Sequence, residues 1–177
     1  MKKICFAIAA FCSALSVNIS HADSEILRND LTGHLYQRFD KSLSWESSKM
    51  DCQKRGGYLA TVTSADENDF LSSNFIKDKN PGGIWLGGSN DRSGAWEWVT
   101  GEVWEFNNWN EGEPNNVGGT VKGGSEHYLV MGHFPGRGKW NDINSYNNGL
   151  LIFSEFYEVS RLCEWDSGSS YILIEDQ

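Results

Sequence analysis

The chain of 177 residues carries 24 acidic and 15 basic side chains, and its formal net charge is −9. This balance disfavours binding to nucleic acid or to anionic membrane surfaces, because both require clustered Lys and Arg. With 39% hydrophobic and 13% aromatic residues, the sequence can bury a core, which excludes intrinsic disorder as a class. The length suits one ordinary domain.

Residues 1–22 have the features of a secretory signal peptide. Lys2 and Lys3 form a basic start, the apolar stretch 4–17 is too short to span a bilayer, and Ala22 provides a small side chain for cleavage. A short membrane anchor is the alternative. We expect an exported protein, secreted or periplasmic and bacterial, without a transmembrane segment in the mature chain. The expected divisions are a signal peptide at 1–22, a lead at 23–31, a domain at 32–166 and a C-terminal extension or last strand at 167–177.

Export changes the cysteine count. Cys5 and Cys12 belong to the signal segment, so only Cys52 and Cys163 remain in an oxidising compartment. We expect these two residues to form a disulfide; two free buried thiols are the alternative.

The first expected elements are a strand and a helix. Alternating side chains predict a strand over 34–39, in which His34 is assigned a structural role. Ser44 is a helix cap, Trp45 and Cys52 lie on one helical face, and Gly56 ends the helix.

A second helix begins at Ser64, where Glu67 completes the capping-box pattern, and it ends before residues 80–83. Helical periodicity is then lost. Short strands are expected at 84–86, 95–100, 128–131 and 161–165. Residues 171–175 compete with 161–165 for the last strand. The order predicts an α+β fold.

The segment from 107 to 148 is crowded with Asn, Gly and acids and shows little helix or strand pattern. A loop of this length in a small domain is normally functional or disordered. Carboxylates and side-chain amides are the oxygen ligands that calcium prefers, and they occur here as Glu113, Asn115, Glu126, Asn141 and Asp142. From composition alone, turn-forming residues and solvated acids remain the alternative.

Five motifs in order resemble the C-type lectin-like domain family. They are Trp45 to Cys52 with the following Gly-Gly-Tyr-Leu-Ala, Ile84-Trp85-Leu86-Gly87, Glu113-Pro114-Asn115, Trp140-Asn141-Asp142 and Cys163-Glu164-Trp165. The resemblance covers residues 32–166. It implies two helices, small antiparallel sheets and a long calcium-binding loop region.

The resemblance also implies a ligand set and a sugar preference. A calcium ion (Ca2+) would be held by Glu113, Asn115, Glu126, Asn141 and Asp142, the last also through its backbone carbonyl, with a cis bond between Glu113 and Pro114. Two open coordination positions would accept vicinal sugar hydroxyls. In that family Glu-Pro-Asn accompanies mannose-type sugars and Gln-Pro-Asp accompanies galactose. We expect the same oxygen ligands, with Tyr146 and His133 stacking on the sugar ring, to bind mannose-type glycans of glycoproteins, polysaccharides or cell surfaces.

The sequence departs from the family pattern at three places. Tyr128 and Ser145 stand near the positions of a second, inner disulfide found in many members. The spacing from Glu113 to Glu126 is longer than usual, so Glu111 is the fallback ligand. An auxiliary calcium site is eroded; its remaining candidates are Asn90, Asp91 and Asn116.

No zinc-protease, phosphate-loop or nucleophile-elbow motif occurs, and calcium-bound carboxylates make poor general acids, so we expect no enzyme. The predicted function is a calcium-dependent lectin with mannose-type specificity. The alternative is a protein-interaction or adhesion module of the same fold, in which calcium is only structural. The Trp residues 45, 85, 96, 98 and 104 are expected to pack in the core or on the sheet.

Overall fold

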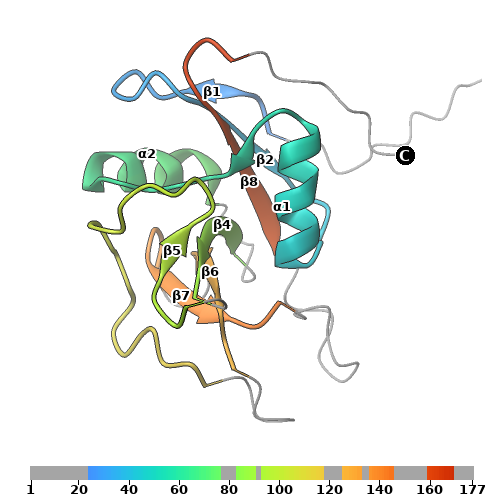
Figure 1. Cartoon of the computed structure of the whole chain (residues 1–177). Coiled ribbons are helices and arrows are strands. Elements are labelled where there is room, and N and C mark those ends of the chain that lie inside the picture. The colour runs from blue at the N-terminus through green and yellow to red at the C-terminus, as the bar shows by residue number, and fades with distance from the viewer. Residues whose placement is uncertain are drawn as a thin grey trace, which may run out of the picture.

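The computed structural model describes residues 24–76, 83–90, 93–117, 125–132, 136–145 and 159–169. In this part of the chain, two helices and an eight-stranded sheet form an α+β fold, as predicted (Figure 1). The expected signal peptide and the competing strand at 171–175 lie outside the described residues. Among the described residues, no helix has the length and apolar character needed to cross a membrane.

Helix α1 (Trp45–Lys54) begins and ends where the sequence predicts. The hydroxyl of Ser44 accepts a hydrogen bond from the backbone N–H of Ser47, which satisfies one of the free donors of the first turn. Trp45 and Cys52 are buried on one face. Gly56, with a φ of 80°, follows the helix in the left-handed region that glycine tolerates best.

Helix α2 (Ala65–Phe75) begins at the predicted cap, but the capping box is altered. The Ser64 hydroxyl accepts from the backbone N–H of Glu67, as expected. The Glu67 carboxylate accepts instead from the backbone N–H of Thr63, one residue before the cap. Glu67 is turned inward because Tyr36 donates to its other oxygen.

The strands belong to one sheet. They are β1 (Leu27–Arg28), β2 (Leu35–Phe39), β3 (Tyr58–Leu59), β4 (Ile84–Ser89), β5 (Glu97–Trp98), β6 (Tyr128–Met131), β7 (Trp140–Ile143) and β8 (Ser160–Trp165). The order is β1-β2-β8-β4-β6-β7, with β3 beside β8 and β5 beside β4. The expected small antiparallel sheets are therefore joined, because β4 and β8 pair in parallel.

Both faces of the central strand β4 are buried. Ile84 and Leu86 point into a hydrophobic cluster that includes Leu71 of α2, whereas Trp85 points into a second cluster that includes Trp45 of α1. The two helices lie apart from each other (Figure 1), and each contributes side chains to a different cluster. The five Trp residues expected in the core or on the sheet are buried or packed against it.

The predicted disulfide between Cys52 and Cys163 is confirmed, with the two Cα atoms 5.3 Å apart. It links α1 to β8 across 111 residues of sequence. The bond therefore ties the start of the domain to its last described strand.

Strand β7 is the main correction to the predicted elements. The segment 107–148 was expected to have little regular structure, yet it contains β6, itself predicted, and β7. The polar side chains of Asn141 and Asp142 interrupt the alternation by which a strand is recognised. Strand β5 is shorter than expected, and β1 and β3, with two residues each, are too short for a pattern.

Candidate functional site

The Glu-Pro-Asn segment reaches the end of β7 through backbone pairing. The backbone N–H of Trp140 donates to the Asn108 carbonyl at 3.0 Å, and the N–H of Asn110 donates to the Trp140 carbonyl at 2.9 Å. The Glu113 N–H then donates to the Asn110 carbonyl at 3.1 Å. This pairing brings Glu113, far from β7 in sequence, next to the strand that carries Asn141 and Asp142.

Asp142 is the centre of the site. Its side chain is fully buried, and its two oxygens accept backbone N–H groups of Asn115, at 3.0 Å, and Asn116, at 2.9 Å. Each carboxylate oxygen has more than one acceptor position, so these bonds leave room for a further partner. Asp142 therefore holds the Glu-Pro-Asn turn against the sheet.

Glu113 and Asn115 form the outer part of the site. The Asn115 side-chain amide donates to Glu113 at 2.8 Å, and the Asn115 backbone N–H donates to the second Glu113 oxygen at 3.1 Å. The peptide bond between Glu113 and Pro114 is cis, as the sequence predicts. Both side chains thus lie at the surface beside Asp142.

Asn116 connects the turn to Glu126. Its side-chain oxygen accepts from the Glu126 backbone N–H at 2.7 Å, and its φ of 53° is in the left-handed region that Asn tolerates better than most residues. From sequence, Asn116 is a candidate only for an auxiliary metal site. The preference of Asn for left-handed turns is the signal that suggests this structural role.

The carboxylates of Glu113, Glu126 and Asp142 affect one another electrostatically. Burial, followed by the charges of Asp142 and Glu113, raises the pKa of Glu126 to about 8. Burial, a hydrogen bond with Asp142 and the charge of Asp142 also raise the pKa of Glu113. The three groups therefore lie close enough to disfavour simultaneous ionisation in the absence of a cation.

Asn141 contributes an unsatisfied acceptor. Its side-chain oxygen is buried and has no hydrogen-bond partner among the described residues. A buried amide oxygen without a partner is uncommon, because losing its bond to water is costly. A cation beside Asp142 would satisfy this oxygen and reduce the repulsion between the acids.

Other predicted site residues lie elsewhere or outside the described residues. Tyr146 and His133, expected to stack on a sugar, and Asp91 are outside the described residues. Glu111 is exposed. The Asn90 side-chain oxygen contacts His127 Nδ1 at 2.7 Å, so in the described part of the chain it is already engaged by protein.

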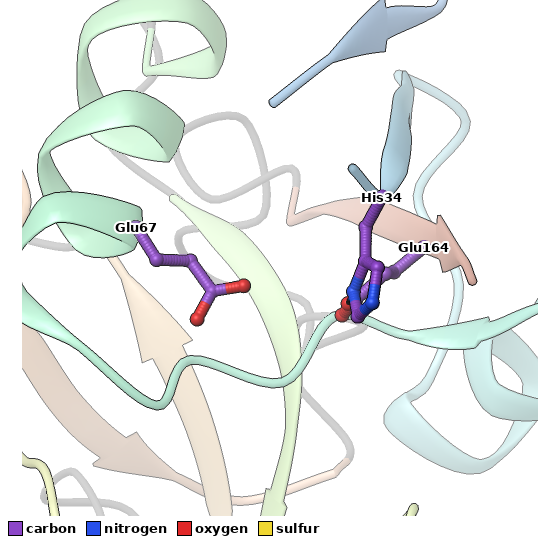
Figure 2. Close-up of side chains that lie close together, drawn as sticks. All are labelled: His34, Glu67 and Glu164. Carbon is purple, nitrogen blue, oxygen red and sulfur yellow. Dashed lines mark hydrogen bonds and ion pairs between the residues drawn. The ribbon is translucent and has the colours of Figure 1, made fainter. Parts of the chain in front are cut away.

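A second acidic cluster, which the sequence analysis missed, lies in the core between β2, β8 and α2. Figure 2 shows the side chains of His34 and Glu164 meeting, with Glu67 directed toward them from the helix. His34 Nδ1 is 2.5 Å from a Glu164 oxygen. One ligand atom from each of the three residues lies within 4.8 Å of the others. Assigning His34 a structural role agrees with this placement.

Hydrogen-bond donors surround this buried cluster. The Tyr36 hydroxyl lies 2.6 Å from a Glu67 oxygen and 3.2 Å from a Glu164 oxygen. The second Glu164 oxygen accepts from the backbone N–H of Thr61 at 2.8 Å. The hydrogen bond with Glu164 raises the pKa of His34, which favours the protonated imidazole as a donor and counter-charge.

Comparison with known proteins identifies the domain. The model of the lectin C-type domain matches residues 41–152, which is more than half of the chain. The chain belongs to the C-type lectin domain family. This family consists of non-enzymatic binding domains, which supports the prediction that the chain is not an enzyme.

Relatives of this C-type lectin domain include proteins of different kinds. A lectin of Pleurodeles waltl is 34% identical over 113 residues, which are 60% of this chain and 61% of that protein. The chain thus spans less than two thirds of this relative.

Solved structures support the fold alone, because their identities are low. The carbohydrate-recognition domain of cow CD23 has a TM-score of 0.59 and 24% identity, over 77% of this chain and 90% of that one. A calcium-independent type II antifreeze protein also has a TM-score of 0.59, with 19% identity, over 84% and 98%. The fold therefore does not specify the function, and the site residues must carry that argument.

Proposed function

We propose that this C-type lectin domain binds mannose-type sugars through a calcium ion held by Glu113, Asn115, Glu126, Asn141 and Asp142. The observation that carries the proposal is the buried Asn141 oxygen, which has no hydrogen-bond partner among the described residues and directly precedes Asp142, together with the pKa values of Glu113 and Glu126, which are raised by burial and by the neighbouring acids. Both features call for a cation. The donor atoms are all oxygens, as calcium prefers.

The residues fit the proposed ion on chemical grounds. Asp142 is buried and fixed by two backbone N–H groups, so it can serve as a rigid ligand. Asn115 is exposed and Glu113 is half-buried, so a ligand can reach both side chains. Bound calcium would supply open coordination positions for two vicinal hydroxyls.

The protein side chains would then select the hydroxyls by hydrogen bonding. A carboxylate such as Glu113 accepts a hydrogen bond from a sugar hydroxyl, while the side-chain amide of Asn115 donates a hydrogen bond to the oxygen of the same hydroxyl. To do so, the bond between Asn115 and Glu113 in this structure must be exchanged for bonds to the sugar. The order of acid and amide fixes which hydroxyl directions are accepted, and the Glu-Pro-Asn order favours mannose-type sugars.

The biological partners follow from the same proposal. An exported lectin of this type would bind glycans on glycoproteins, polysaccharides or cell surfaces. The cow CD23 carbohydrate-recognition domain, which shares the fold, was solved in the presence of a GlcNAc2Man3 oligosaccharide, and this supports the choice of a mannose-containing sugar as the ligand to test. The basic and apolar segment 1–22 supports export.

Titration calorimetry tests the proposal directly. Calcium should bind first, with a dissociation constant near 10⁻⁴ to 10⁻³ M by order of magnitude, as is common in extracellular modules. Mannose should then bind with measurable heat, galactose should bind more weakly, and EDTA should abolish both responses. Asp142→Ala should remove calcium binding, whereas Glu105→Gln, a change at an exposed acid outside the ligand set, should preserve it.

The outcomes separate the two candidate functions. Calcium heat without any sugar heat would support the interaction module in which calcium is structural. Equal calcium affinity in the wild type and Asp142→Ala would reject the ligand set. Preference for galactose over mannose would reject the specificity.

A further inference from the structure

Glu46, on the surface of α1, contacts the start of β6, which follows Glu126, and the segment after β7, the strand that carries Asn141 and Asp142. Its carboxylate accepts from the Tyr128 hydroxyl at 2.8 Å through one oxygen and from the Ser145 hydroxyl through the other. Burial raises the pKa of Glu46, but the hydrogen bonds from Ser145 and Tyr128 outweigh burial and leave it below its ordinary value. The group is therefore an ionised acceptor at neutral pH.

The two hydroxyls lie close to the calcium ligands in sequence and on the sheet. Tyr128 begins β6, two residues after Glu126, and Ser145 follows β7, three residues after Asp142. In the register of β6 and β7, Tyr128 pairs with Ile143 and Leu129 pairs with Asp142. The Glu46 carboxylate thus fixes the same end of both strands to α1.

Packing directs Tyr128 toward the helix as well. Its ring lies 4.7 Å from the ring of Trp45, centroid to centroid, and Trp45 directly precedes Glu46 in α1. Tyr128 and Ser145 are both buried, at 8% and 5% exposed. Loss of the Glu46 carboxylate would remove a charged acceptor from both hydroxyls, which is costly at buried positions.

Among the described residues, no covalent cross-link joins β6 or β7 to the rest of the domain. The disulfide joins Cys52 to Cys163, which leaves no cysteine in β6 or β7. The strand ends that flank Glu126 and Asp142 must be positioned by non-covalent contacts. Charge-assisted hydrogen bonds, roughly twice as strong as neutral ones, are suited to this task.

We infer that Glu46 is a positioning residue for the calcium site: it bridges Tyr128 and Ser145 and thereby sets the spacing between Glu126 and Asp142. The inference rests on the proposed calcium site. Glu46 touches neither the ion nor the sugar; it acts through the ends of β6 and β7. Loss of the bridge should therefore weaken calcium binding more than it weakens the fold.

The test measures calcium affinity by calorimetry and terbium luminescence sensitised by nearby Trp140, alongside thermal melting of the metal-free and calcium-loaded protein. Glu46→Ala should weaken calcium binding about tenfold, or about 1.4 kcal/mol. Glu46→Gln, which keeps the length and one acceptor oxygen but loses the charge, should lose less than threefold. Tyr128→Phe and Ser145→Ala should each lose an intermediate amount, and Glu105→Gln should match the wild type.

Each outcome bears on the inference. A drop in melting temperature of Glu46→Ala that is equal in both forms, with unchanged calcium affinity, would show a merely structural role and overturn it. Equal losses in Glu46→Gln and Glu46→Ala, together with unchanged calcium affinity in Tyr128→Phe and Ser145→Ala, would assign the effect to the charge of Glu46 acting at a distance, without the bridge, and would also overturn it. If Glu46→Ala fails to fold, Tyr128→Phe and Ser145→Ala give the answer. A wild type that binds no calcium would reject the proposed function and this inference together, whereas a normal wild type with normal variants rejects only the inference.

Discussion

This domain has two groups of neighbouring acidic side chains, one in the core and one in the loop site. They differ in how the cost of burying their charges is offset. In the core, Glu67 and Glu164 are 3% and 2% exposed, yet donors from Tyr36, Thr61 and Thr63 surround them and His34 provides a counter-charge. In the loop site, the side-chain interactions between acids are repulsive. Burial and the charge of Glu67 raise the pKa of Glu164, and the hydrogen bonds with His34 and Thr61 lower it. In the core, protein groups therefore supply the partners that these two acids need.

The loop site is incomplete by the same criterion. Among the described residues, the pKa of Glu126 rises to about 8 and the Asn141 oxygen lacks a partner, whereas backbone N–H groups satisfy Asp142. Acid count alone thus does not indicate a metal site. A metal site is indicated when a group has more buried acceptors than donors, because each buried acceptor must be satisfied by a donor or by a cation.

The largest expected effect is the pH dependence of the loop site. A raised folded pKa means that Glu126 contributes stability below its unfolded value of about 4.5, and that this contribution is lost as pH rises toward about 8. Metal-free protein should lose about 3 kcal/mol of unfolding free energy over this window, a figure reduced from the full shift because solvent screens this partly exposed group, and millimolar calcium should restore part of it. Urea unfolding at pH 5 and pH 8, with calcium or EDTA, measures the difference.

Matched variants identify the carboxylate responsible. Glu126→Gln should reduce this pH dependence in EDTA and abolish calcium binding, because it removes both the repulsion and the ligand. Glu111→Gln should behave as the wild type. The reverse pattern would make Glu111 the ligand, and a pH-independent difference between calcium and EDTA would break the contrast between the two acidic groups.

Neutralising an acid in the core group should lower the unfolding free energy, whereas neutralising Glu126 removes a repulsion from the metal-free loop site. Glu164→Gln replaces one acceptor oxygen by a donor, which leaves either the Thr61 N–H or the His34 ring N–H without its acceptor, whereas Tyr36 keeps its hydrogen bond to Glu67. The expected loss is about 3 kcal/mol, the range for breaking a buried ion pair from one side. Chemical unfolding with saturating calcium measures it; a stabilised Glu164→Gln would contradict the view that the core group is complete.

A smaller effect is expected at Asn116, where the loop site depends on its backbone. Asn116→Ala loses the acceptor for the Glu126 N–H and strains a residue whose φ is 53°, so we expect a loss of about 1.5 kcal/mol. Asn116→Gly loses only the acceptor and should lose less. Thermal melting with saturating calcium compares them, and equal losses would exclude backbone strain as a cause.

The sequence predicted the elements whose local signals are strong. Ser44 and Ser64 mark helix starts by a short-range rule, and the disulfide followed from the two cysteines left after export. Strand β7 was missed because Asn141 and Asp142 serve the site at the expense of the strand pattern. Function and regular patterning conflict at the same residues.

The two acidic groups differ in how much of each could be predicted from the sequence. The loop ligands could be proposed from sequence because contiguous motifs, Glu113 to Asn115 and Trp140 to Asp142, resemble a known family. The core group comes from three separated segments, and Glu67 was assigned only to its helix cap. No local rule brings His34 near Glu164, since their proximity depends on the pairing of β2 with β8.

The smallest expected effect concerns protonation of His34 in the core group. Its raised pKa means that the charged form stabilises the protein below about pH 6.5, and that this contribution is lost as pH rises through the folded value. Glu164, Asp166 and Glu67 all raise that pKa, whereas burial opposes them. His34→Ala should lose about 1 kcal/mol at pH 6 and less at pH 9, with calcium saturating throughout. His34→Asn keeps a donor near the position of Nδ1 but cannot titrate, so its unfolding free energy relative to wild type should improve as pH rises. Parallel pH profiles for His34→Ala and the wild type would show that the imidazole acts only as a neutral donor, and the core group would then need another source of positive charge.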